Sequence, residues 1–446
     1  MPTFISRGVL VLTLTATGGP VAAQAITGAP GSAGGLFGGH HPVTPTATSQ
    51  RLWTNFDLST GLDTGSQSGL LSTTTAETHK QFADTAGAAI GYWRGKNTRY
   101  FDVSANSFMN RQEIAPTELY GGRAQVGGGL NTGRTLRLNA SASVALDGAA
   151  VSAITAPPAG ATSEDLVRRS TYVGGVLDDR WRTTTGTAGA GFTWSRQQST
   201  TASGWLSASV PVRGSGLDSE ARGLTLQHLW NLDRSQGLTF GYRFSGNRQH
   251  RAEDLGLGLE SHVRSHAVDV GWRSERHLSS IRTVTLWVAG GMTFTTEEAL
   301  GGTAPTYSAP VYSGGTALSL TRVWFFSAEA RREVSVVAGV SPVPFTSDSG
   351  NVRLDWVPSP RMRLALAGLF TVGHGADESR PDTFRSSNAL AQFQYGLARC
   401  CGIFTTYNFY RHRLVDVPVP IGFPASYDRQ AIRIGFSLWL PLYGSF

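Results

Sequence analysis

The sequence has few charged residues, only two cysteines and no long apolar run. Charged residues make up 15% of its 446 positions, whereas soluble globular proteins carry about 25%. This speaks against two or three soluble domains, although the chain is long enough for them. The absence of runs of about 20 apolar residues excludes a helical membrane protein.

Glycine and aromatic residues are abundant instead. The chain has 54 glycines and an aromatic content of 10%, against a usual glycine content of about 7%. So many aromatics argue against intrinsic disorder. These proportions leave a large β-protein whose exterior does not need to be charged.

The formal net charge is +7, but the basic residues are dispersed and form no run of five or more. We therefore expect no binding to nucleic acid, and rather attraction to acidic lipopolysaccharide or anionic solutes. Cys400 and Cys401 are adjacent in a predicted turn. They form either a vicinal disulfide or a pair of free thiols, and two thiols are too few for a structural zinc site.

The first 50 residues predict an export signal followed by a leader. Residues 1–25 read as a secretory signal peptide, with Arg7 before an apolar core at 8–17 and a cleavage site near residue 23 or 25. Residues 26–50 are rich in Gly, Pro, Ser and Thr and predict a flexible periplasmic leader. The barrel described next would span 51–446.

From residue 50 onward, apolar residues alternate with polar or small ones. The segments 136–146, 284–294 and 432–440 show this period of two, which is typical of a strand with one apolar and one polar face. Each alternation lasts about ten residues, the length that a tilted strand needs to cross a bilayer. A propeller or a soluble sandwich would have shorter strands.

Breaks between these segments alternate between short and long. The short ones include Asn131–Arg134, Asp178–Arg182 and Asn231–Gln236, and the long ones include Asp147–Arg168 and Gln197–Asp218. Eight short and nine long breaks predict 18 strands, with 16 or 20 as alternatives. The expected fold is all-β, a single transmembrane antiparallel up-and-down barrel with short periplasmic turns and longer extracellular loops.

The C-terminal segment Arg433–Phe446 resembles the last strand of Gram-negative outer-membrane β-barrel proteins of the large porin-like type. In that class, the barrel-assembly machinery recognises a terminal aromatic residue, so the resemblance implies this role for Phe446. Pro441 and Gly444 depart from the pattern. The segments 395–399, 407–411 and 438–441 are also similar to barrels associated with exopolysaccharide export.

Charged residues on the polar strand faces are expected to point into the lumen, because arginine facing lipid would cost roughly 2 to 4 kcal/mol. Small residues such as Gly127, Gly129, Gly189 and Gly241 are expected to leave the interior uncrowded, and Trp and Tyr to gather at strand ends. The charged residues either brace the wall in pairs or line a pore with a modest positive excess. The candidates are Arg123, Arg137, Arg243, Asp269, Arg273, Glu329, Arg331, Arg353, Asp355, Arg363 and Arg433.

No catalytic, nucleotide-binding or metal-binding motif occurs in a suitable context. His228 is the nearest candidate for catalysis, but a histidine at the barrel rim is the better interpretation, so we predict no enzyme activity, cofactor or metal. The leading hypothesis is an outer-membrane channel for hydrophilic solutes, either anionic or saccharide. The alternatives are a structural or surface-interaction barrel with an occluded lumen, and a dedicated exopolysaccharide exporter. Expected partners are membrane lipid, lipopolysaccharide, the assembly machinery, and the transported solute or polysaccharide.

Overall fold

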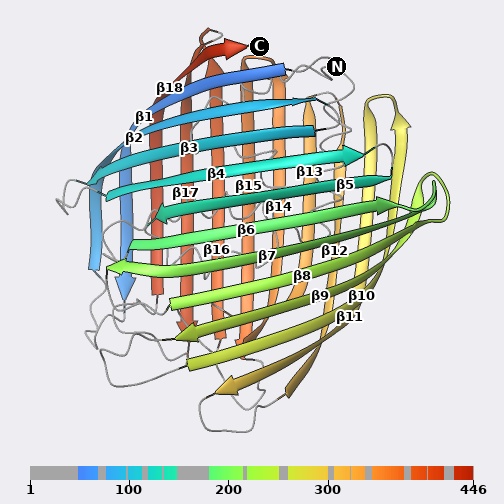
Figure 1. Ribbon diagram of the computed structural model, residues 1–446. Coiled ribbons are helices and arrows are strands. Elements are labelled where there is room, and N and C mark those ends of the chain that lie inside the picture. The colour runs from blue at the N-terminus through green and yellow to red at the C-terminus, as the bar shows by residue number, and fades with distance from the viewer. Residues whose placement is uncertain are drawn as a thin grey trace.

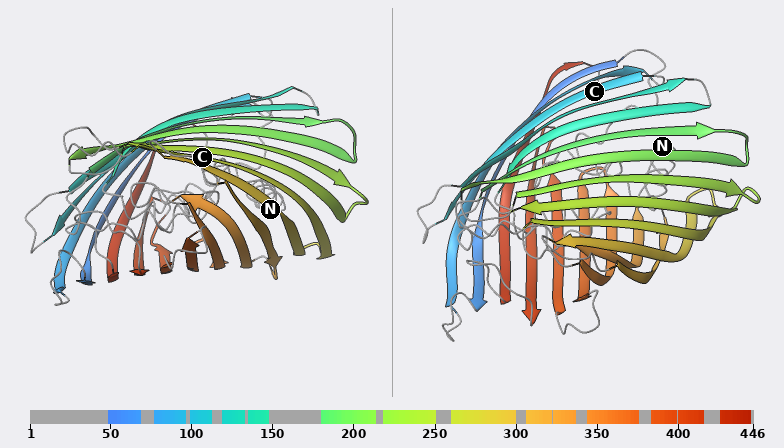
Figure 2. Two further views of the ribbon diagram at one scale, coloured as in Figure 1. Left: turned by 90° about the horizontal axis from the view of Figure 1, so that it is seen from below. Right: turned by 60° about the horizontal axis from the view of Figure 1, so that its bottom comes forward.

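The strands of the protein form one closed antiparallel ring. In the computed structural model, each strand pairs with its neighbours in sequence, and β1 (Ser49–Ser68) also pairs with β18 (Ser426–Gly444). The ring has 18 strands, as predicted. Figure 1 shows the near wall crossing the far wall at a steep angle, as expected for strands tilted in a barrel. The views in Figure 2 show the wall curving round until the blue and red ends meet.

The structure describes residues 49–68, 77–96, 99–112, 119–132, 135–147, 180–213, 218–250, 260–299, 306–321, 323–336, 344–375, 383–398, 400–415 and 426–444. The predicted signal peptide, nearly all of the leader and Phe446 lie outside these residues and remain predictions. The described part contains no helix able to span a membrane. The strands between β1 and β18 are β2 (Glu77–Lys96), β3 (Arg99–Gln112), β4 (Leu119–Thr132), β5 (Leu136–Asp147), β6 (Arg180–Thr193), β7 (Gln198–Arg213), β8 (Asp218–Asn231), β9 (Gln236–His250), β10 (Glu260–Ser279), β11 (Arg282–Ala299), β12 (Thr306–Ser319), β13 (Trp324–Val336), β14 (Pro344–Ser359), β15 (Met362–Gly375), β16 (Thr383–Gly396) and β17 (Cys401–Val415).

Alternating side chains give the ring an apolar outer face. Leu58, Val288 and Ile434 are 60%, 55% and 61% exposed, although they lie in the middle of long strands. On β11 the outward apolar positions run from Val284 to Phe294. At about 3.3 Å per residue and a tilt of about 40°, they cover about 25 Å along the barrel axis, the height of a lipid-facing band.

Connections at the two ends of the barrel differ in length. Segments of two to four residues join the strands at one end, for example 232–235 between β8 and β9. At the other end, the segments between strands have up to 32 residues, at 148–179. In outer-membrane barrels the short turns are periplasmic, so we call the two ends periplasmic and extracellular.

Two predicted breaks near residue 200 are wrong. Asp178–Arg182 was expected to be a turn, but Arg180 begins β6, and the turn lies at 194–197. Gln197–Asp218 was expected to be a loop, but it contains β7, which pairs with β6 and β8. The outward face of β7 carries mostly Ala, Gly and single large residues such as Leu206, so its alternation is hard to see. The strand expected before Asp178 lies outside the described residues.

The turn between β8 and β9 is held by the carboxylate of Asp233. Its Oδ1 accepts hydrogen bonds from the backbone N–H groups of Ser235 at 2.5 Å and Gln236 at 2.7 Å, and from the Ser235 hydroxyl at 2.9 Å. These bonds lower the pKa of Asp233 below its usual value, and the hydrogen bond from the Ser235 backbone contributes most. Asp233 therefore stabilises the turn only while it is ionised.

We expect Asp233→Asn to lower the urea midpoint slightly at neutral pH, because asparagine offers these N–H groups no charge. Since the pKa is lowered in the folded state, the contribution of Asp233 is complete above its unfolded pKa of about 3.9. It is lost as the pH falls through the folded value. Urea titrations of both proteins at pH 7 and below pH 3 measure the difference, and an equal difference at both pH values would contradict this role.

Candidate functional site

The inner face of the barrel is polar and carries paired charges. The strand register places all eleven predicted lumen residues on this face. For Arg123, opposite Asn106, the structure describes the backbone but not the side chain. Sequence reasoning missed Glu275 and Glu333, which share the period-two face of Arg273 and Arg331. The described inward arginines are Arg137, Arg243, Arg273, Arg331, Arg353, Arg363, Arg429 and Arg433, and the inward acidic residues are Asp57, Asp102, Asp269, Glu275, Glu297, Glu329, Glu333 and Asp355.

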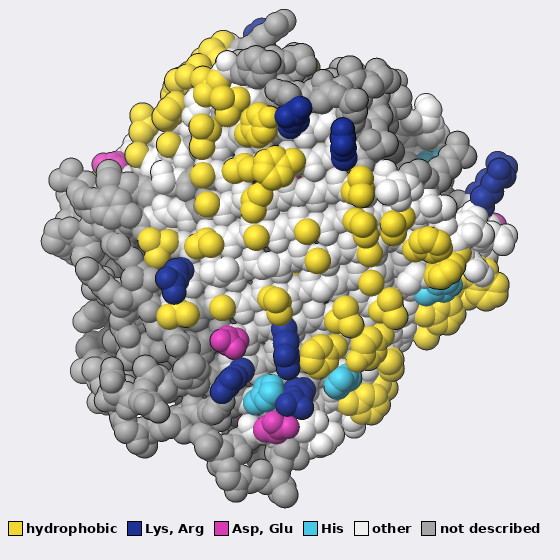
Figure 3. Space-filling view, viewed as in Figure 1, with side chains coloured by type: hydrophobic (Ala, Val, Ile, Leu, Met, Phe, Trp, Pro, Cys, Tyr) yellow, Lys and Arg dark blue, Asp and Glu magenta, His cyan; other side chains and the backbone are white. Residues whose placement is uncertain are grey.

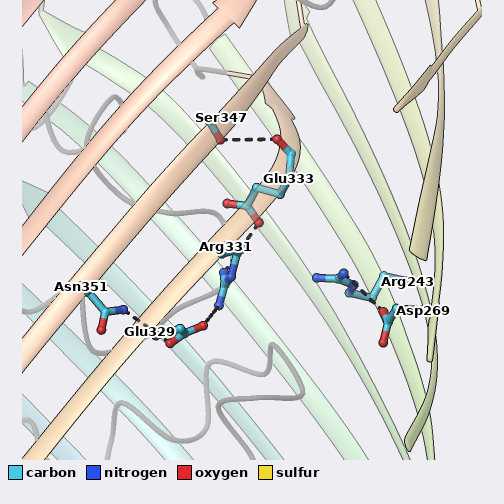
Figure 4. A network of polar contacts seen from close by, with 7 residues as sticks. All are labelled: Arg243, Asp269, Glu329, Arg331, Glu333, Ser347 and Asn351. Carbon is cyan, nitrogen blue, oxygen red and sulfur yellow. Dashed lines mark hydrogen bonds and ion pairs between the residues drawn. The ribbon is translucent and has the colours of Figure 1, made fainter. Parts of the chain in front are cut away.

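The largest group of contacts centres on Arg331 of β13. Its guanidinium lies 2.8 Å from a carboxylate oxygen of Glu329 and 3.6 Å from one of Glu333. Asn351 of β14 donates to Glu329 at 3.4 Å, and the Ser347 hydroxyl donates to the backbone carbonyl of Glu333. Figure 4 shows these five residues as a chain along β13 and β14. Two carboxylates thus compensate one buried guanidinium.

A second group joins β14 and β15. The Arg353 guanidinium contacts Asp355 at 2.5 Å, and that of Arg363, on the next strand, contacts the same carboxylate at 2.8 Å. The side chain of Asp355 is only 10% exposed. One buried carboxylate therefore compensates two guanidiniums across a strand boundary.

Further pairs lie on β9 and β10. Arg243 and Asp269 are 3.3 Å apart and form a separate pair in Figure 4. Arg273 contacts Glu275 at 2.6 Å, and Glu275 also lies 3.6 Å from His277. The two arginine–carboxylate contacts join opposite charges, so they brace the wall as well as make it polar.

The described inner face carries no excess of arginine. The expected positive excess of the wall is therefore not found among the described side chains, where eight arginines face eight acidic residues. The net charge of the chain arises elsewhere, because other arginines lie on the outer face and in turns. Selectivity for anions does not follow from the wall charge alone.

Several inner glycines do not widen the interior as expected. The indole of Trp205 lies over Gly223, directly opposite on β8, where an added Cβ would come within 2.4 Å of the ring. Trp287 covers Gly315 of β12 in the same way. The predicted small residues Gly127, Gly129, Gly189 and Gly241 are covered by Asp102, Tyr100, Asn139 and Asp269 respectively.

Tryptophan and tyrosine gather on the outer face at the periplasmic end, as expected for an interfacial belt. Trp230 and Tyr395 lie there, and the rings of Trp324 and Trp356 stack with centroids 5.5 Å apart. Trp205, Trp287, Tyr100 and Tyr410 are among the exceptions that face inward.

His228 lies on the outer face near this belt, where its Nδ1 is 3.0 Å from the hydroxyl of Thr200. Trp194 donates to the same hydroxyl at 2.8 Å. Among the described residues, no group of three His, Cys, Asp or Glu side chains could hold a metal ion. Cys400 and Cys401 are free thiols.

A closed, antiparallel ring with an apolar outer band and a polar interior is the architecture of outer-membrane β-barrels, because closure leaves no unpaired strand edge in the lipid. The chain is an outer-membrane β-barrel protein. No protein-family model and no curated protein matches it.

Among solved structures, similar barrels include Pseudomonas aeruginosa OpdL, at 9% identity over 88% of this chain and 99% of that one, with a TM-score of 0.42. OpdK from the same organism, solved with vanillate, is 8% identical over 87% and 99% of the two chains, also with a TM-score of 0.42. Acinetobacter baumannii OccAB2 is 10% identical over 87% and 98%, again at 0.42. Likenesses this distant do not bear on the substrate, which must be argued from the residues of the barrel.

Proposed function

We propose that the protein is a porin-like channel through which hydrophilic solutes cross the outer membrane. The observation that carries this proposal is the inner face of β4 to β9, where Gln125, Ser203, Thr225 and Arg243 are only half-buried. Inward side chains of a filled barrel would be buried throughout. A ring of 18 strands is also wide enough for an aqueous channel, as in porins of 16 to 18 strands.

The balance of the described charges on the inner face favours uncharged, hydroxyl-rich solutes such as saccharides over anions. Inward amides and hydroxyls support this preference. Gln125, Thr225 and Gln227 face the interior and are only half-buried. Such groups can both donate hydrogen bonds to the hydroxyl groups of a passing sugar and accept them.

Planar-bilayer conductance of the purified protein tests the channel. We expect open-channel currents with a permeability ratio of K⁺ to Cl⁻ near one, because charges of both signs are equally frequent among the described inner side chains. Arg137→Glu, an exposed inner substitution, should shift the ratio toward K⁺. Arg222→Glu, on the outer face, is the matched control and should leave it unchanged. No current at any voltage would rule out an open pore.

A second candidate, a barrel with an occluded lumen, is favoured by the inner face of β16 and β17. There Asn388, Gln392, Thr406 and Tyr410 are buried, Tyr410 to 1% exposure. The two candidates differ in the effect of deleting residues 26–50. A rise in conductance would support occlusion by the leader, and unchanged conductance would contradict it.

A further inference from the structure

Arginines also point outward at the extracellular end of the barrel. Of the 38 lysines and arginines in the sequence, only Lys80 and Lys96 are lysines. A planar guanidinium suits phosphate better than an ammonium does, because it donates two parallel hydrogen bonds. The described outward basic residues at this end are Arg182, Arg222, Arg248, Arg264, Arg332, Arg385, Arg411 and Arg413.

On β9 and β10, the outward Arg248 and Arg264 lie next to acidic residues of the barrel. Glu220 lies opposite Arg248 in the ladder. Glu298 lies 3.4 Å from His262 and 3.8 Å from Arg264. Figure 3 shows basic, acidic and histidine side chains together near the lower edge of this wall. Such a cluster needs no external partner.

Arg332 of β13 is compensated as well. Two of its nitrogens contact the Asp348 carboxylate at 2.7 and 2.6 Å, and Tyr312 donates to the same carboxylate at 2.9 Å. The Arg332 guanidinium also lies over the Tyr312 ring, 5.3 Å from its centroid. Arg248, Arg264 and Arg332 thus each have an acidic neighbour among the described residues. Arg182 and Arg222 lie opposite uncharged residues only.

Arg385 of β16 and Arg413 of β17 differ from these. They are directly opposite one another in the ladder, and both are exposed on the outer face. Like charges in this arrangement repel and destabilise a strand pair. Neither makes a hydrogen bond or ion pair with any described residue. Arg411, two residues from Arg413 on the same face, contacts Asp428 at 2.9 Å, and Asp428 is the acidic residue next to the pair in the described ladders.

The height of this arginine pair fits a lipid headgroup. Tyr395, in the periplasmic aromatic belt, and Arg385 lie ten residues apart on the outward face of β16. At about 3.3 Å per residue and a tilt of about 40°, the pair lies about 25 Å above the belt, at the far edge of the apolar band. The surrounding lipid there belongs to the outer leaflet.

We propose that Arg385 and Arg413 together bind a phosphate group of lipopolysaccharide in the outer leaflet. The phosphate would lie between the two guanidiniums and turn their repulsion into two attractive contacts. Arg411 stays with Asp428 and limits the site to one anion. This site does not depend on whether the lumen conducts.

Native mass spectrometry of the purified, folded protein in detergent tests the proposal. We expect diphosphoryl lipid A to bind at least about tenfold more tightly to the wild type than to the variant R385Q/R413Q, since the variant loses both charge-assisted contacts with the phosphate. Lipid A stripped of its phosphates should show no such difference. R385K/R413K should bind with intermediate affinity.

The matched control is R196Q/R234Q, which removes two arginines from turns at the periplasmic end and should bind lipid A like the wild type. Equal binding of diphosphoryl lipid A to the wild type and R385Q/R413Q would overturn the site. So would inorganic phosphate at equal concentration displacing the lipid completely, because the ligand would then be a free anion. Gel mobility before and after heating verifies that each variant is folded. If R385Q/R413Q does not fold, the single variant R413Q replaces it in the binding test.

Discussion

Leu226→Arg is expected to destabilise the barrel by about 2 to 4 kcal/mol, the cost of a cation on the lipid face near the bilayer centre. Leu226 lies on the outward face of β8, is 44% exposed, and is four residues from Trp230 of the aromatic belt. The guanidinium of the new arginine would have to leave water for hydrocarbon. Urea unfolding in lipid vesicles, followed by tryptophan fluorescence, measures the loss.

Gln227→Arg is the matched control, one position along the same strand. Gln227 faces inward opposite Thr201 and Gly241 and is half-buried. Arginine there meets a polar interior, so we expect a change below about 1 kcal/mol. If both substitutions had the same effect, the assignment of faces would be wrong for β8.

Asp355→Ala should cost roughly 3 kcal/mol. Removing one partner of a buried ion pair typically costs 3 to 5 kcal/mol, because the remaining charge is left in a poorly hydrated place. Asp355 compensates both Arg353 and Arg363. Their side chains are 23% and 24% exposed, so partial hydration places the cost at the lower end of that range. The urea midpoint in vesicles is again the measurement.

Asp428→Ala provides the comparison. Asp428 and Arg411 are 42% and 41% exposed on their side chains, and exposed pairs contribute about 0 to 1 kcal/mol. The two alanine variants remove the same group, so their difference reflects the burial of Asp355 and its second arginine. A loss for Asp428→Ala as large as for Asp355→Ala would show that burial does not set the cost.

Strand faces were predictable from the sequence wherever large apolar residues alternate. The outward set from Val284 to Phe294 on β11 and that from Ile432 to Phe436 on β18 lie on the outer face as expected. β7 was missed because its outward residues are mostly small and its inward ones include Trp205, which reverses the usual contrast. Strand ends were also underestimated. β1 continues to Ser68 through polar residues that pair with β18 beyond the apolar band.

The pairs of the inner wall were only partly predictable. Arg353, Asp355 and Arg363 are close in sequence and flank a short turn, so their contact could be anticipated. That Glu329, Arg331 and Glu333 share one face was also readable from their spacing of two, but the contact of Glu333 with Ser347 of β14 was not. Which aromatic ring covers which glycine on the neighbouring strand depends on the exact register. A period-two pattern in the sequence does not reveal the register.

The sequence by itself determined which side chains face lipid and which face the interior, because alternation is a local property of an extended chain. Only the tertiary structure decided which of them meet. Arg385 lies opposite Arg413, and Asn55 of β1 accepts a hydrogen bond from Ser437 of β18, 382 residues away, where the ring closes. Such neighbours follow from the register of the hydrogen-bonded ladders and from closure, which depend on the whole ring rather than on any one strand.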